Sequence, residues 1–255
     1  MIKAFDNEDI KRWAHFSGDY NGIHFDAELA RKNGLRDIII QGMLALTEVK
    51  IQLCPRVDKP STIHFYLKEP VARDTDIHYQ LCARPGGYFC SASTSDKTCI
   101  TGRLKEGIPG AIARAATPVD IDNRFIHEQL TLLRMLFPDM KESWILMDAF
   151  LFSVCFKYQH GDPFFMKAKK ITRQPDKSRV VTYQVDQTII LTDGIFNYDF
   201  TDLAGLTFYF QDRDIIKEDF SVYSILDYQV YYHQKLLFQS SMGSVTRASL
   251  NEGQQ

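Results

Sequence analysis

Two stretches of this chain are predicted to form helices with apolar residues on nearly every side. One covers residues 41–53 and is stopped by Pro55, which cannot continue a helix, and the other covers residues 143–156. A helix that is apolar around most of its circumference has to be enclosed by other elements. The rest of the chain must therefore supply a wrapping layer for each of the two helices.

Strand-like segments follow each of these two helices. The first helix precedes 62–67, 77–83 and 88–103, and the second precedes 164–172, 179–191, 221–232 and 234–246. Further helices are predicted at 7–16, 26–32 and 122–137. The order of elements repeats although the two halves share no evident sequence identity. The pattern predicts an α+β fold in which two antiparallel sheets, each around one helix, lie side by side and protect their exposed faces.

The boundary between the halves is marked by small and turn-forming residues. Gly107-Ile108-Pro109-Gly110 and the small-residue run to Pro118 show neither helical nor strand periodicity. We therefore expect an N-terminal unit at 1–106, a linker at 107–120 and a C-terminal unit at 121–255.

The loop after the predicted helix at 7–16 holds the residues that indicate a chemical function. Residues 16–26 read F-S-G-D-Y-N-G-I-H-F-D, and Gln41-Gly42-Met43 opens the apolar helix that follows. Asp19 supplies a group that is ionised near neutrality, and His24 supplies one that changes charge there. Such a pair is what proton transfer to or from a bound water requires. The alternative interpretation is that these residues only form turns, with a half-buried, satisfied histidine.

This run resembles the hydratase 2 motif of MaoC-like (R)-specific enoyl-CoA hydratases, F-S-G-D-x-N-P-I-H-x-D followed some twenty residues later by H-G-M. Gly22 and Gln41 stand where the family usually has proline and histidine. The resemblance implies a double hot-dog fold, and because the second half lacks the motif we expect one active site per chain. The positions that match in register are Ser17, Gly18, Asp19, Asn21, Ile23, His24 and Asp26.

The resemblance also implies roles for individual residues. Asp19 and His24 would hold the water that adds to, or leaves, C3 of a thioester-linked acyl chain, and the backbone N–H of Gly42 would face the thioester oxygen. Ser17, Asn21 and Gln41 would support this site. The implied activity is hydration of a trans-2-enoyl thioester, or dehydration of an (R)-3-hydroxyacyl thioester, in fatty-acid or polyketide-type metabolism. The partner would be coenzyme A or an acyl carrier protein, and no cofactor is expected.

Two other functions stay open on the sequence. Glu48 and Asp148 lie on the two apolar helices, and hot-dog thioesterases carry an acid from such a helix. The bland interpretation makes Glu48 part of a solvated helix face and Asp148 a buried carboxylate bonded to its neighbours. A hot dog that binds an acyl ligand or carrier protein without turnover is the non-enzyme alternative.

Some further side chains are expected to have no part in catalysis. His127 and His160 are expected at the surface. Lys167, Lys169 and Lys170 either meet phosphates or an acidic carrier, or lie on a solvated strand edge.

Composition excludes several classes of function. A net charge of −2 and the lack of a long basic tract argue against nucleic acid, and the absence of a membrane-length apolar run predicts a cytoplasmic protein. The five cysteines form no C-x-x-C pair, so we expect free thiols and no metal site. No nucleophile-elbow, dinucleotide-binding or P-loop motif is present. Whether two chains associate as a homodimer stays open.

Overall fold

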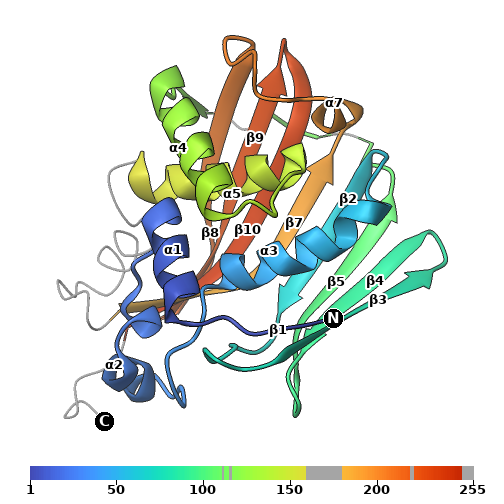
Figure 1. Ribbon diagram of the computed structural model, residues 1–255. Helices are drawn as coiled ribbons and strands as arrows, with labels where there is room; N and C mark the ends of the chain where they lie inside the picture. Colours follow the sequence, from blue (N-terminus) through green and yellow to red (C-terminus); the bar gives the residue numbers. More distant parts are fainter. Residues whose placement is uncertain (111, 115–116, 159–179, 219–220, 249–255) are drawn as a thin grey trace.

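One antiparallel sheet forms the frame of the molecule (Figure 1). The computed structural model describes residues 1–110, 112–114, 117–158, 180–218 and 221–248. Within this part of the chain, ten strands lie in the order β1-β3-β4-β5-β2-β7-β10-β9-β8-β6. The strands are β1 (Ile2–Lys3), β2 (Ser61–Leu67), β3 (Ile77–Arg84), β4 (Gly87–Ser93), β5 (Thr98–Glu106), β6 (Thr117–Val119), β7 (Val180–Leu191), β8 (Leu206–Glu218), β9 (Ser221–Tyr232) and β10 (Lys235–Ala248).

The helices gather on one face of this sheet (Figure 1). α3 lies against the strands of the first half, and α5 crosses those of the second half. The helices are α1 (Asn7–Ser17), α2 (Ala27–Lys32), α3 (Gly42–Leu53), α4 (Asn123–Leu136), α5 (Ser143–Lys157) and α7 (Asp193–Phe196), with short 3-10 turns η1 (Gly22–His24) and η2 (Cys54–Arg56). The predicted α+β fold, with two sheet regions around two apolar helices, is confirmed.

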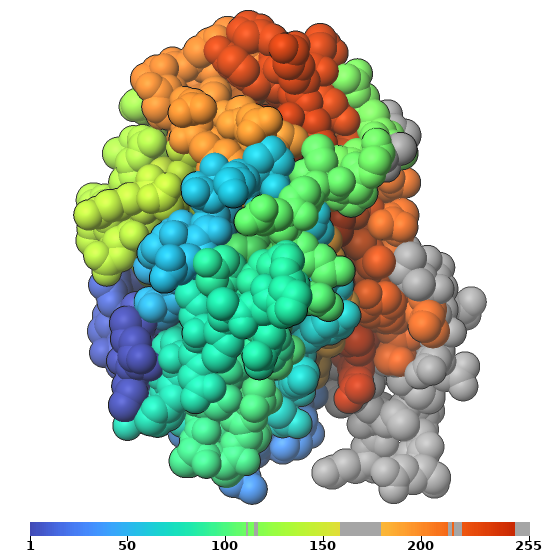
Figure 2. All heavy atoms as spheres, turned by 90° about the vertical axis from the view of Figure 1, so that its right-hand side faces the viewer, coloured from blue at the N-terminus to red at the C-terminus, as the bar shows by residue number. Residues whose placement is uncertain are grey.

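The two halves meet through β2 and β7. These strands pair antiparallel from Ser61 opposite Leu191 to Tyr66 opposite Asp186, so the hydrogen-bonded sheet is continuous across the junction. Figure 2 shows the surface of the first half, blue to green, beside the orange and red strands of the second half. Most buried apolar side chains of both halves form one large hydrophobic cluster, and Ile23, Ile39 and Val181 form a small second one. The continuous sheet and the shared core therefore join the two halves directly.

The two central helices are enclosed as their composition predicts. Every residue of α5 from Trp144 to Cys155 is buried, as are nine residues of α3. By contrast α1 is amphipathic: Asp6 caps it through a capping box, and Trp13 on its buried side packs against Phe137 and Phe152 of the second half. α1 therefore connects the first half to helices α4 and α5 of the second half within the helical layer.

A buried ion pair joins the two central helices. Lys50 Nζ on α3 lies 2.5 Å from Asp148 Oδ2 on α5, and the two side chains are 0% and 3% exposed. Gln187 on β7 donates from Nε2 to Asp148 Oδ1 at 2.8 Å and to Ser240 Oγ at the same distance. Burial lowers the pKa of Lys50, against the opposing influence of the Asp148 carboxylate.

Three expectations from the sequence need correction. The segment 88–103 is not one strand but parts of β4 and β5, joined by a polar turn in which Thr94 N–H donates to the Lys97 carbonyl. The sequence did not predict β8, because charged residues interrupt the alternation of apolar and polar residues that is typical of a strand. One of these residues, Arg213, pairs with Asp227 on β9 at 2.6 Å. The segment 107–120 contains β6, which pairs with β8.

Some expectations fall outside the described residues. These are the strand at 164–172, together with His160, Lys167, Lys169 and Lys170. The division into units at 1–106 and 121–255 stays a prediction.

Candidate active site

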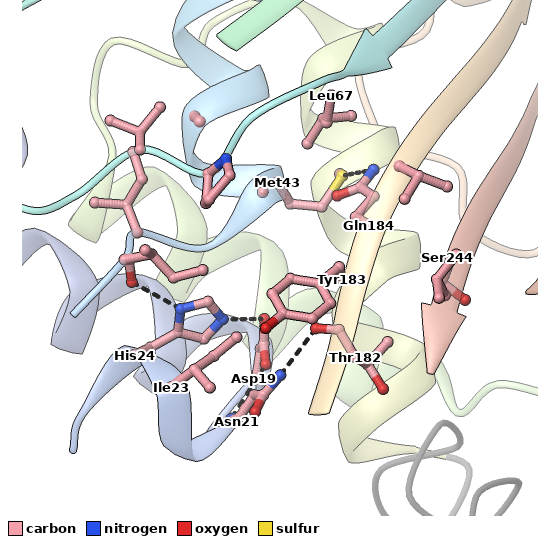
Figure 3. A pocket seen from close by; sticks show the side chains of 18 of the residues that line it. Asp19, Asn21, Ile23, His24, Met43, Leu67, Thr182, Tyr183, Gln184 and Ser244 are labelled. Atoms are coloured by element: carbon pink, nitrogen blue, oxygen red, sulfur yellow. Dashed lines mark hydrogen bonds and ion pairs between the residues drawn. The ribbon is translucent and has the colours of Figure 1, made fainter. Parts of the chain in front are cut away.

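A cavity of about 370 Å³ lies between the two halves. Its position follows from the sheet: β2 and β7 stop pairing after Tyr66 and Asp186, and the chain on both sides of this point, at 67–71 and 182–185, lines the cavity. The loop that carries Asp19 and His24 supplies another wall, and the first residues of α3 a further one (Figure 3). The volume is within the range of small-molecule sites.

The local sequence explains how the loop places Asp19. α1 ends at Gly18, whose φ of 83° is a left-handed conformation that favours glycine. The backbone N–H of Asp19 then donates to Ser17 Oγ at 3.1 Å, and the N–H of Asn21 donates to Asp19 Oδ1 at 3.3 Å. The predicted supporting residue Ser17 is fully buried and braces the turn.

His24 follows on the 3-10 turn η1 and faces Asp19 across the cavity wall (Figure 3). Its Nδ1 lies 2.8 Å from the carbonyl oxygen of Ile39, which can only accept, so Nδ1 carries a hydrogen and Nε2 keeps its lone pair in the neutral ring. Nε2 lies 4.0 Å from Asp19 Oδ2. That distance is too long for a direct hydrogen bond.

Burial shifts both groups toward their neutral forms. Asp19 is 9% exposed and His24 6%. Burial raises the pKa of Asp19, with the neighbouring His24 acting in the opposite direction. Burial lowers the pKa of His24, with Asp19 and the Ile39 carbonyl opposing. The imidazole is therefore neutral at neutral pH, and the carboxyl group has an increased affinity for a proton.

Asn21 ties this loop to the second half of the chain. Its Nδ2 donates to the carbonyl oxygen of Thr182 on β7 at 3.0 Å. Gly22, where the related motif usually has proline, packs closely on α2: a methyl group placed on it would lie 2.4 Å from Leu29 Cδ2. The glycine at this position therefore suits the tight contact between η1 and α2.

Gln41 and Gly42 are adjacent in sequence, but only Gly42 lines the cavity. Gln41 is fully buried and its Nε2 donates to the Ile10 carbonyl of α1 at 3.1 Å, so its side chain is not part of the cavity wall. Gly42 begins α3 and lines the cavity. A methyl group on Gly42 would lie 2.9 Å from Leu67 Cδ2 and 3.0 Å from Gln184 Oε1. The structure thus brings Asp19, Asn21, His24 and Gly42 to one cavity and leaves Ser17 and Gln41 behind it.

For the wall that the second half contributes, sequence reasoning named only Tyr183, as one of several aromatic residues that either line an acyl-chain tunnel or fill the core of the sheet. Tyr183 and Gln184 on β7, Met242 on β10 and Phe152 and Phe156 on α5 all line the cavity. A glutamine in a strand of largely apolar and β-branched residues is a weak signal that could have drawn attention to Gln184. Which side of the strand it faces depends on pairing with distant residues.

The two acids of the thioesterase alternative lie elsewhere. Glu48 is buried and pairs with Lys3 at 2.6 Å, so the expectation of a solvated helix face is wrong. Asp148 is buried and bonded, as its bland interpretation predicted, although its partners are Lys50 and Gln187. Neither acid lines the cavity. His127 is exposed, as expected.

No group of three or more histidine, cysteine, aspartate or glutamate side chains in the described part of the chain could hold a metal ion. Nor is any helix there long and apolar enough to cross a lipid bilayer.

Comparison with known proteins agrees with the motif and the fold. Residues 3–56 match the family model described as MaoC like domain. A mitochondrial 3-hydroxyacyl-[acyl-carrier-protein] dehydratase from Arabidopsis thaliana is 48% identical over 42 residues, which are 16% of this chain and 25% of that protein. The match thus spans about a quarter of that relative's length.

Two solved structures share the fold over nearly the whole chain. A MaoC-like dehydratase is 12% identical with a TM-score of 0.52, covering 97% of this chain and 96% of its own. A conserved hypothetical protein from Mycobacterium tuberculosis with a double hot-dog fold is 9% identical with a TM-score of 0.53, covering 96% and 94%. Residues 3–56 are thus similar to a MaoC like domain, and the chain as a whole has a double hot-dog fold.

Proposed function

We propose that the cavity between the two halves is the active site of a hydro-lyase that interconverts trans-2-enoyl and (R)-3-hydroxyacyl thioesters. The observation that carries this proposal is the placement of Asp19 Oδ2 and His24 Nε2, 4.0 Å apart, beside the first residue of α3. Two atoms at this separation can both lie about 2.8 Å from one water oxygen, or from the hydroxyl oxygen of a substrate.

Proton transfers follow from the pKa directions. In hydration, the oxygen of the water forms a bond to C3, the neutral His24 Nε2 accepts a proton from that water, and the carboxyl group of Asp19 delivers a proton to C2. Hydration leaves an Asp19 carboxylate and a His24 imidazolium, and a proton that passes from His24 to Asp19 through a bridging water restores both groups. Dehydration is the reverse: the Asp19 carboxylate takes a proton from C2, the His24 imidazolium gives one to the C3 hydroxyl, and water leaves. The raised pKa of Asp19 favours the protonated carboxyl group that can donate a proton, and the lowered pKa of His24 favours the neutral imidazole that can accept one.

The start of α3 provides the electrostatic part of the mechanism. The acyl carbonyl gains negative charge as the C2 proton moves, and the first N–H groups of a helix are positive and unpaired within the helix. The N–H of Gly42 is such a group at the cavity. Because Gly42 has no side chain, a carbonyl oxygen can approach its backbone closely.

The remaining walls suit an acyl chain. Met43 and Ile100 from the first half, and Phe152 and Met242 from the second, give the cavity a largely apolar lining. The Arabidopsis relative's name supports a carrier-protein thioester as substrate, and coenzyme A presents the same thioester. Thioester hydrolysis is the less favoured alternative, because Glu48 and Asp148 are paired with Lys3 and Lys50 outside the cavity.

The direct test is the decrease of enoyl absorbance when short and medium 2-enoyl-CoA substrates are mixed with the protein. We expect Asp19→Asn and His24→Ala each to lower kcat by about 10²- to 10⁴-fold. Asp76→Asn and His78→Ala are matched controls, because both residues are exposed on or beside β3 and away from the cavity. Unchanged rates in both site variants would remove these roles, and release of free thiol would indicate hydrolysis instead.

A further inference from the structure

We propose that Gln184, on β7 of the second half, donates a hydrogen bond to the thioester carbonyl beside the N–H of Gly42. This inference rests on the proposed function, because it names a second group that meets the acyl carbonyl. It assigns a polar role at the site to the half of the chain that lacks the hydratase motif.

A β-bulge turns Gln184 toward the cavity. On β10, Met242, Gly243 and Ser244 are consecutive, and their partners on β7 are Gln187, Asp186 and Gln184. One residue of β7, Val185, is therefore extra. Because side chains alternate along a strand, a regular β7 would place Gln184 on the face opposite Gln187, and the extra residue reverses this.

Contacts on both sides of the bulge confirm the direction. Gln187 reaches Asp148 on α5, which lies on the helical face of the sheet. Gln184 reaches Met43 on α3, on the same face, with Nε2 3.3 Å from the methionine Sδ (Figure 3). Its Oε1 and Cβ would lie 3.0 and 3.3 Å from a methyl group placed on Gly42. The carboxamide therefore sits directly over the start of α3.

The carboxamide is weakly held in this position. A thioether sulfur is a weak hydrogen-bond acceptor, and no hydrogen bond to Oε1 is formed within the described part of the chain. Rotation of the terminal amide by half a turn places Nε2 on the side of Gly42, where Oε1 now lies. Exchanging a weak sulfur acceptor for a carbonyl oxygen that is gaining charge favours this rotation when substrate binds.

The consequence is a two-donor site built from both halves. Gly42 contributes a backbone N–H from the first half, and Gln184 contributes a side-chain N–H from the second. Loss of a single donor of this kind typically lowers kcat by about 10²- to 10³-fold. Because the bond strengthens as charge develops, the change is expected mainly in kcat, with KM altered only a few-fold.

Two variants and one matched control test the assignment. Gln184→Leu removes the donor and keeps similar bulk, and Gln184→Glu keeps the shape but places an acid beside the carbonyl. Gln80→Leu makes the first change on an exposed strand residue of β3. We expect about a 10²-fold loss of kcat in Gln184→Leu, a larger loss in Gln184→Glu, and none in Gln80→Leu.

A binding measurement separates this inference from the acid/base roles. 2,4-Hexadienoyl-CoA absorbs at longer wavelength when its carbonyl is polarised, and it can be bound to the Asp19→Asn protein so that turnover does not interfere. We expect a red shift on binding that is reduced in the Gln184→Leu and Gln184→Glu proteins and kept in Gln80→Leu.

Each result decides between the two proposals. A red shift that is the same with and without Gln184 overturns the inference. If the red shift depends on Gln184 but the unsubstituted protein does not hydrate enoyl-CoA, the inference is supported and the proposed reaction is refuted. No binding of the probe by the unsubstituted protein overturns both. Thermal unfolding of each variant shows whether it is folded, and Gln184→Glu, the closest in shape, keeps the test valid if Gln184→Leu is not.

Discussion

Removing Asp148 should destabilise the protein strongly, because it leaves Lys50 charged and unpaired in the core. The ion pair has a separation of 2.5 Å, and the lysine side chain is 0% exposed. Loss of one partner of a buried pair costs about 3–5 kcal/mol. For a chain of this size each kcal/mol lowers Tm by about 2–4 °C, so Asp148→Leu should lose about 10 °C. The double variant Lys50→Met/Asp148→Leu restores an apolar contact and should lie within about 1.5 kcal/mol of the unsubstituted protein.

Urea unfolding and thermal melts at pH 7 measure both differences. A pH series adds a specific signature. Burial lowers the pKa of Lys50, and without Asp148 it falls further. Between this folded-state pKa and the unfolded value near 10.5, the unfolded chain binds more protons, so stability rises with pH. The deficit of Asp148→Leu should therefore shrink as pH rises from the Lys50 pKa of the variant to the higher Lys50 pKa of the unsubstituted protein, and stay constant above it.

A small deficit, below about 1 kcal/mol, would show that water or a local rearrangement solvates Lys50, and would refute the account of a dry ion pair. A double variant as unstable as Asp148→Leu would refute it as well. The double variant also tests the thioesterase alternative, since retained turnover in a protein without Asp148 excludes that acid from catalysis.

Three further predictions follow from single contacts. Burial raises the folded-state pKa of Asp19 above the unfolded value of 3.8, so ionising this group destabilises the folded protein. In denaturant unfolding, the stability advantage of Asp19→Asn should therefore grow as pH rises from about 4 toward neutrality. A difference that stays constant with pH would contradict the raised pKa. Gly42→Ala would place a methyl group 2.9 Å from Leu67 Cδ2 and 3.0 Å from Gln184 Oε1. We therefore expect kcat for an enoyl thioester to fall at least tenfold, while circular dichroism shows that the protein is still folded. An unimpaired rate would show that the carbonyl binds elsewhere. Asp6→Ala removes the cap of α1 and should cost about 1 kcal/mol in urea unfolding, with no change expected if α1 were held by packing alone.

The features predicted well from sequence are those that local chemistry determines. The apolar helices α3 and α5 lie at the predicted positions because their composition requires enclosure. Gly18, Asp19 and His24 belong to consecutive turns that nearby residues form, and the Ile39 carbonyl then fixes the ring of His24. The motif is therefore visible as a contiguous run.

The features that were missed depend on pairing between distant segments. The direction of Gln184 is set by a bulge relative to β10, about sixty residues further along the chain, and no local pattern reports it. The strand character of β8 is stabilised by its ladder with β9 and is obscured by Arg213 and its charged neighbours. The buried Glu48 has its charge partner in Lys3 on β1, 45 residues earlier in the chain.

Continuity of the sheet through β2 and β7 has a consequence for how such a protein can change. Two identical subunits that met along this edge would have to carry the same residues in both walls of a shared pocket, so any mutation would appear twice. In a tandem chain each wall mutates independently. Here the first half carries the loop with Asp19 and His24, and the second half lines the opposite wall of the cavity with different residues, among them Tyr183, Gln184 and Met242.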